Sequence, residues 1–176
     1  MKKSRLLSAI AVFAFLVALG GLGVGVSSAS SDEAISSLRS QLDEKYPNLE
    51  AIRAQFGSGY YGEDATWSET QEPSMHDDTI MLTTTWMMHP AIEIAATEVG
   101  DNFFLVLVRV EEAGVLDFLG IDKGSSKEDV IRVFGEPDSS DDASLHYEDV
   151  SGYTNVRFEL DDNDNVWRMR YAVYLD

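Results

Sequence analysis

Cysteine is absent from this chain of 176 residues, and basic residues are scarce. Without cysteine there is no disulfide framework, no thiol nucleophile and no lipid-modified N-terminal cysteine. Only 13 Lys and Arg residues stand against 31 Asp and Glu residues, which gives a net charge of −18. A surface this acidic argues against nucleic acid and anionic membranes as partners, because both present phosphate groups. It fits a basic protein partner or cations, although an acidic surface also simply keeps a protein in solution.

Histidine is scarce as well, and the usual signatures of catalytic sites are missing. The three histidines, His76, His89 and His146, do not have the spacing of metal ligands. No G-x-S-x-G nucleophile motif occurs, and no glycine-rich phosphate loop follows the N-terminal segment. The acidic stretch 161–165 lacks the Gly and Glu that a calcium-binding EF-hand loop needs at its sixth and twelfth positions. We therefore expect no catalytic residue, no metal site and no cofactor.

The first 29 residues have the pattern of an export signal. Lys2, Lys3 and Arg5 precede an apolar run over 9–26, and Ala29 follows two serines at a plausible cleavage site. The alternative is an uncleaved N-terminal anchor, because about 18 apolar residues can just span a bilayer. Either alternative places the rest of the chain outside the cytoplasm, secreted or at the cell surface. The residues after Ala29 carry ten basic and 31 acidic side chains, a net charge of −21.

The segment 120–137 predicts a short helix with both ends specified. Ser125 can cap its N-terminus, with Glu128 completing a capping box. Gly135 suits a left-handed C-terminal position, and Pro137 prevents continuation. The predicted helix is thus the best-defined element of the chain.

An earlier segment repeats this helix, and hydrophobic periodicity predicts the remaining elements. EAIRAQFG at 50–57 aligns without gaps on EDVIRVFG at 128–135, and 32–46 reads as an amphipathic helix. Residues 116–119 are expected to form a helical turn, and 57–78 a long loop that includes at most an edge strand. Alternation and turn signals predict strands at 79–89, 91–99, 103–111, 144–150, 154–160 and 166–175. The predicted fold is α+β: two helix–helix–β–β–β units, residues 30–112 and 113–176, form one antiparallel sheet with helices packed on one face.

Motifs in the second half resemble a known family. The motif G-x-x-x-G-S-S-K-E-D-V-I-x-x-F-G-E-P is followed by L-x-Y at Leu145, V-x-F at Val156 and V-W-x-M-x-Y at Val166. This series resembles the second half of β-lactamase-inhibitor-like proteins, which are similar in fold to the small lipoproteins of the outer-membrane assembly machine. The resemblance covers 116–173 well and 48–110 weakly. It implies a fold rather than a function, and the chain lacks the cysteines of both groups.

Strand alternation suggests a binding surface on the face of the sheet that the helices leave open. In the last strand, Trp167, Met169, Tyr171 and Val173 are expected in the core. The same alternation places Phe104, Val106, Val108 and Val110 in the core. The candidate partner-binding residues are the open-face side chains Phe103, Leu105, Leu107, Arg168 and Arg170, and the loop aromatics Tyr60, Tyr61 and Trp67. Alternatively, the 57–78 loop or the N-terminus covers the open face. Trp67 could also fold back onto the core, and the arginines could pair with Glu93 and Glu159.

These observations favour an exported, non-catalytic protein-binding module, including an inhibitor-like role. The expected partner is another protein, with membrane contact only through an uncleaved N-terminal segment. The alternative function is a structural or assembly factor of the bacterial cell envelope. A hydrolase or small-ligand binder with a pocket on the sheet is a third hypothesis, which acids converging on a pocket would favour.

Overall fold

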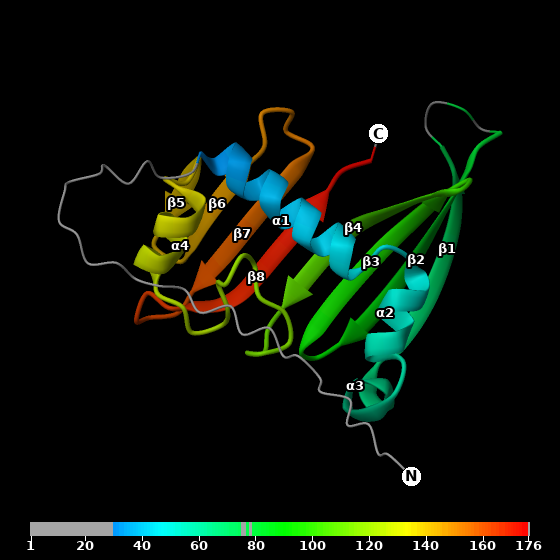
Figure 1. Cartoon of the computed structure of the whole chain (residues 1–176), viewed down its shortest axis with the longest axis horizontal. Coiled ribbons are helices and arrows are strands. Elements are labelled where there is room, and N and C mark those ends of the chain that lie inside the picture. The colour runs from blue at the N-terminus through cyan, green and yellow to red at the C-terminus, as the bar shows by residue number, and fades with distance from the viewer. Residues whose placement is uncertain (1–29, 75–76, 78, 176) are drawn as a thin grey trace, which may run out of the picture.

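A computed structural model describes residues 30–74, 77 and 79–175, so the predicted signal segment 1–29 and His76 lie outside the described residues. Four helices occur in the described part: α1 Ser31–Lys45, α2 Leu49–Phe56, α3 Gly59–Asp64 and α4 Lys127–Phe134. None of these helices has the length and apolar character needed to cross a membrane. In Figure 1, α1 runs diagonally across the middle of a sheet, α4 lies over one end, and α2 and α3 lie towards the other.

The sheet has eight antiparallel strands in the order β1-β2-β3-β4-β8-β7-β6-β5. The first half of the chain supplies β1 Thr66–Pro73, β2 Met81–His89, β3 Ile92–Val99 and β4 Asn102–Val110. The second half supplies β5 Ser139–Asp141, β6 Ser144–Glu148, β7 Thr154–Leu160 and β8 Val166–Val173. The two halves therefore meet where β4 pairs with β8.

The predicted fold of two helix–helix–β–β–β units is wrong. Each half supplies four strands, and only α4 precedes the strands of the second half. The expected helical turn at 116–119 is instead an isolated bridge between Phe118 and Ile121. The expected loop at 57–78 contains α3 and the edge strand β1, which pairs along its whole length with β2. The edge strands β1 and β5 are polar and exposed, so they lack the alternation by which strands are recognised.

The core lies between the helices and one face of the sheet. Ala34, Ile35, Leu38 and Leu42 form the buried stripe of α1, and the Ser30 side chain caps this helix by accepting a hydrogen bond from Glu33 N–H. The cap of α4 lies one residue later than predicted, because Ser126 and Asp129 rather than Ser125 and Glu128 form the capping box. The predicted core positions Met169 and Tyr171 are confirmed as buried, and they pack in one core with Val130, Phe134, Val156 and Phe158. The Phe134 and Phe158 rings lie edge to face, 4.9 Å apart.

Two β-bulges interrupt the alternation of side chains. Ala95 pairs with Leu107 and Ala96 with Leu105, so Val106 is an extra residue in β4. Glu159 pairs with Arg168 and Leu160 with Val166, so Trp167 is an extra residue in β8. An extra residue reverses which face the following side chains occupy. Each bulge therefore changes the surface on which a strand presents its side chains.

Candidate functional site

The face of the sheet opposite the helices, called the open face here, carries part of the predicted site. Leu107 pairs with Ala172, Arg170 pairs with Arg109, and Arg168 pairs with Glu159, all on this face. The structure therefore brings Leu107, Arg168 and Arg170 together on adjacent strands. Among the described residues of 57–78, the strand β1 extends the sheet as its edge and does not lie over the open face.

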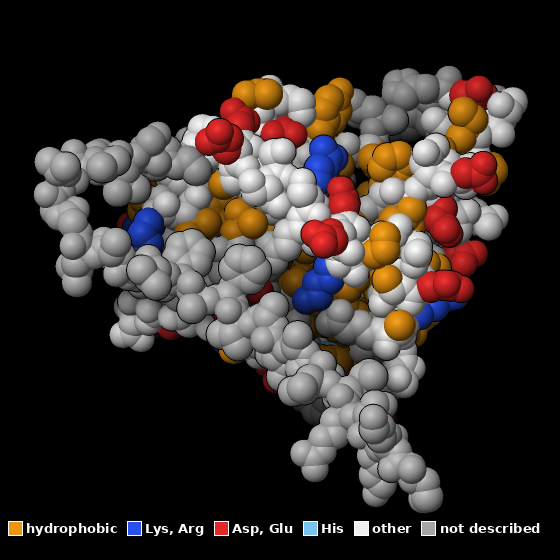
Figure 2. Space-filling view, viewed as in Figure 1, with side chains coloured by type: hydrophobic (Ala, Val, Ile, Leu, Met, Phe, Trp, Pro, Cys, Tyr) orange, Lys and Arg blue, Asp and Glu red, His pale blue; other side chains and the backbone are white. Residues whose placement is uncertain are grey.

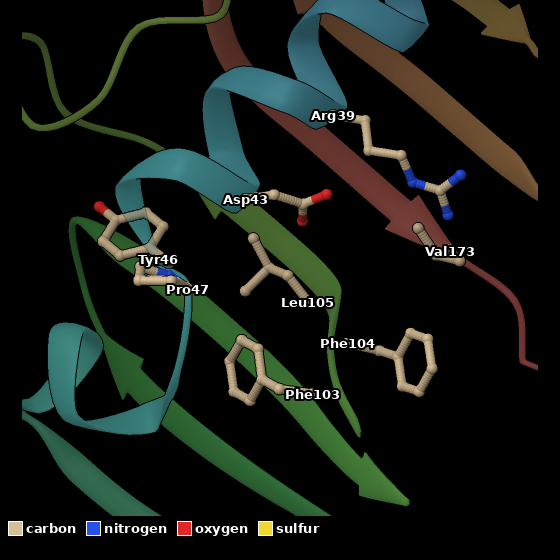
Figure 3. A pocket seen from close by; sticks show the side chains of 8 residues that line it. All are labelled: Arg39, Asp43, Tyr46, Pro47, Phe103, Phe104, Leu105 and Val173. Atoms are coloured by element: carbon tan, nitrogen blue, oxygen red, sulfur yellow. The ribbon is translucent and has the colours of Figure 1, made fainter. Parts of the chain in front are cut away.

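The prediction that Phe103 and Leu105 lie on the open face is wrong. Leu105 is only 4% exposed and belongs to the core, and Phe103 packs against that core. The bulge at Val106 is the reason, because it reverses the alternation over the first half of β4. The predicted core residue Phe104 is instead 39% exposed. Figure 3 shows Phe103 and Phe104 extending to opposite sides of β4.

A bulge also removes Trp167 from the predicted core. The Arg168 guanidinium lies over the Trp167 ring, 4.1 Å from its centre, in a cation–π contact. Val166 takes the buried position opposite Leu160. Sequence alternation could not find either bulge, since β4 reads as a nearly continuous apolar run.

Two aromatic residues of the predicted binding loop, Tyr61 and Trp67, lie away from the open face. Tyr61 is half-buried, and its ring packs edge to face on Phe56 and on His89. Trp67 packs against the core, with Arg53 lying 5.8 Å from its ring centre. Tyr60 belongs to the backbone of α3, but its side chain lies outside the described part. Tyr61 and Trp67 therefore contribute to packing on the helix side of the sheet.

The most distinctive geometry of the molecule lies at the junction between β4 and β8. These strands pair over only four residue pairs, 107–110 with 169–172. Beyond them, residues 102–106 and 173–175 separate and leave an opening that we call the notch. On the helix side, the notch opens into a hollow of about 580 Å³ beneath α1 (Figure 3). The hollow is lined by Arg39, Asp43, Tyr46, Pro47, Phe103, Phe104, Leu105 and Val173.

On the open face, the notch is bordered by an apolar groove. One part of the groove, about 360 Å³, is lined by Ile80, Leu82, Val99, Phe104, Tyr153, Tyr174 and Leu175 together with Ser74. A second part, about 260 Å³, shares Leu82, Tyr174 and Leu175 and adds Trp86 and Val106. Tyr174 is 55% exposed, and Phe104, Leu175 and Ile80 are also exposed. Large apolar side chains thus gather in a concave, solvent-accessible surface.

Beside this groove the open face carries four of the ten basic residues that follow Ala29: Arg109, Arg157, Arg168 and Arg170. Arg109 forms ion pairs with Glu93 at 2.9 Å and Glu111 at 3.2 Å. Arg168 pairs with Glu111 at 2.9 Å and Glu159 at 3.2 Å. The predicted alternative partners are thus confirmed in part, since Glu159 holds Arg168 and Glu93 holds Arg109.

Three arginines occupy directly opposite positions on neighbouring strands and are called the arginine row: Arg109, Arg170 and Arg157. Arg157 donates a hydrogen bond to Ser144 Oγ at 3.2 Å. Neither Arg157 nor Arg170 forms an ion pair with any carboxylate in the described part of the chain. Acidic side chains, by contrast, are scattered over the helix side (Figure 2). The arginine row therefore brings three positive charges together on a face that also carries Glu93, Glu111 and Glu159.

The acids with clearly lowered pKa lie in caps and turns. Hydrogen bonds from Ser126 and Arg132 hold the pKa of Asp129 below its usual range. Hydrogen bonds from Ala143 and Ser144 lower the pKa of Asp141, and Arg157 adds a smaller effect. Within the described residues, no group of three or more His, Asp or Glu side chains is placed to hold a metal ion. These carboxylates therefore stabilise local structure and do not converge on a pocket.

Comparison with models of known families, with curated proteins and with solved structures found no match for this chain. The resemblance to β-lactamase-inhibitor-like proteins therefore stays a prediction.

Proposed function

We propose that this protein is an exported, non-catalytic binding module that holds a partner protein on the open face of its sheet. The observation that carries the proposal is the apolar groove at the notch. Soluble proteins seldom expose contiguous apolar surface unless it makes contacts. Here exposed side chains of Phe104, Tyr174 and Leu175 gather in a concave surface, while most other surface positions are polar.

The chemistry of the groove supports a macromolecular partner. Interface cores are enriched in aromatic residues and arginine, and the groove and its surroundings supply both. Its two parts are shallow and open along the sheet, which suits an extended segment better than a compact small molecule. The export pattern of the first 29 residues supports a partner outside the cytoplasm.

A binding experiment with matched variants tests the proposal. The purified chain without residues 1–29 is immobilised and exposed to the culture fluid and envelope extract of the producing organism. Any captured protein is then purified and tested for direct binding. We expect Phe104→Asp and Tyr174→Asp to abolish binding while circular dichroism shows intact folding. Val150→Asp is the control, since Val150 is 91% exposed and does not line the groove. A captured partner that binds both groove variants as tightly as the wild type would show that the groove is not the site.

A further inference from the structure

In the described part of the chain, ion pairs with carboxylates neutralise only one of the three arginines in the arginine row, Arg109. Like charges in directly opposite positions on neighbouring strands repel one another. Glu93 and Glu111 compensate Arg109, and Asp141 interacts electrostatically with Arg157, but neither Arg157 nor Arg170 forms an ion pair with a described carboxylate. A carboxylate placed over Arg170 and Arg157 would relieve the repulsion and accept charge-assisted hydrogen bonds.

The row also lies at a fixed distance from the apolar groove. Ala172 and Arg170 alternate on the open face of β8, and Tyr174, one residue past the end of this strand, lines the groove on the same face. Tyr174 and Arg170 are four residues apart, about 13 Å at ~3.3 Å per residue. Phe104, Leu107 and Arg109 run alongside on β4. The surface is therefore apolar at the notch, and the arginine row crosses the paired part of the strands, where Glu93, Glu111 and Glu159 also lie.

An extended peptide lying along this surface would also direct every second side chain to the same side. Its side chains at alternate positions would face the sheet, so an apolar anchor in the groove would lie four residues from a side chain over Arg170. A polyphosphate chain suits the site poorly, because every phosphate unit is negatively charged. The units that do not contact the arginine row would lie against the acidic surface of the protein. A protein segment can confine its acids to the positions above the row.

We propose that the apolar groove at the notch and the arginine row together bind an extended segment of a partner protein. In this segment an acidic residue lies four positions from an aromatic or aliphatic anchor. This inference rests on the proposed function, because it names the chemistry of the partner that the open face holds. The anchor occupies the groove at Phe104 and Tyr174. The carboxylate bridges Arg170 and Arg157.

A synthetic peptide tests this pattern directly. The probe is a nonapeptide of serines with Phe, Val, Glu and Glu at its second, fourth, sixth and eighth positions, and the reversed sequence covers the opposite chain direction. Binding is followed by chemical-shift changes in ¹⁵N-labelled protein. We expect saturable changes confined to residues near the notch and the arginine row. A peptide with Gln in place of both Glu residues should bind about 3–10-fold more weakly, the range expected for carboxylate–arginine contacts at a surface.

Protein variants separate the two halves of the site. Arg170→Gln and Arg157→Gln should each remove most of the preference for Glu over Gln. Phe104→Ala should weaken the binding of the Glu and Gln peptides by the same factor, because it removes the contact with the anchor. Arg132→Gln is the matched control, since Arg132 is an exposed arginine on α4 and not on the open face. It should bind like the wild type.

Three outcomes would overturn the inference. One is equal binding of the Glu and Gln peptides to the wild type, in either chain direction. Another is an unchanged preference for Glu in both Arg170→Gln and Arg157→Gln. The third is concentration-dependent self-association that produces the same shift changes without peptide, which would assign the notch to a second copy of the chain. In the first two cases the proposed function survives if Phe104→Asp still abolishes binding of a captured partner.

Discussion

Replacing Leu105 and Phe104 one at a time tests the bulge that shapes the candidate site. The two residues are neighbours in sequence, but Leu105 is 4% exposed and Phe104 is 39% exposed. Replacing a core leucine by alanine costs about 2–5 kcal/mol, the loss of transfer free energy plus the cost of the cavity. Leu105 borders the open hollow beneath α1, so truncation enlarges a space that already exists. We therefore expect Leu105→Ala to cost about 2–3 kcal/mol, the lower part of that range.

Phe104→Ala should cost about 1 kcal/mol, because much of this ring is already in contact with water. Urea denaturation monitored by tryptophan fluorescence measures both free energies of unfolding, and unchanged slopes would show that the unfolded states are comparable. Leu107→Ala is the control for the open face beyond the bulge and should resemble Phe104→Ala. The reasoning fails if Phe104→Ala costs more than Leu105→Ala, because the alternation of β4 would then run without interruption.

Further predictions concern the core, the helix cap, the buried tyrosines and calcium. Phe134→Ala should lower the free energy of unfolding by about 3–5 kcal/mol in urea denaturation, and a loss under 1 kcal/mol would contradict its central place in the core. Ser126→Ala should cost about 1 kcal/mol by removing the cap of α4, whereas Ser125→Ala should cost less. Burial raises the pKa of Tyr171 to about 12, so its contribution to the free energy of unfolding should be fully present below pH 10 and should fall as the pH rises towards 12. Tyr171→Phe should reduce this loss of stability at alkaline pH, and an unchanged dependence of stability on alkaline pH in the variant would contradict the prediction. Calorimetry should detect only weak, diffuse calcium binding, and a tight stoichiometric site at Asp161–Asp164 would refute this expectation.

The sequence predicted those elements that bury an apolar stripe. The helices α1, α2 and α4 and the six inner strands were found within a few residues, because their periodicity records which face meets the core. The edge strands β1 and β5 bury too few side chains to show such a periodicity. The helix α3 contains two glycines in six residues and was therefore assigned to a loop. Both segments of the internal likeness are helical, as α2 and α4, but in the described residues only α4 precedes the strands of the second half.

The candidate site was predicted less completely than the core. Arg168, Arg170 and Leu107 were placed on the correct face, because no bulge lies between them and the buried residues used as reference. Phe103 and Leu105 were misplaced because one extra residue at Val106 reverses the alternation. An uninterrupted apolar run carries no signal of such an insertion. The notch also escaped prediction, since it depends on how far two distant strands pair.

The short β4–β8 pairing has a consequence for the cooperativity of the molecule. Four residue pairs join two four-stranded halves, and α1 reinforces the connection because it belongs to the first half but contacts β6, β7 and α4. The amide hydrogens at 107–110 and 169–172 that bond between β4 and β8 should exchange through an opening that leaves both hairpin systems folded, and should exchange faster than those that bond β4 to β3 or β8 to β7. A ligand that contacts both β4 and β8 would slow this hydrogen exchange. The exchange rate of the amides between the two halves would therefore report whether the ligand is bound.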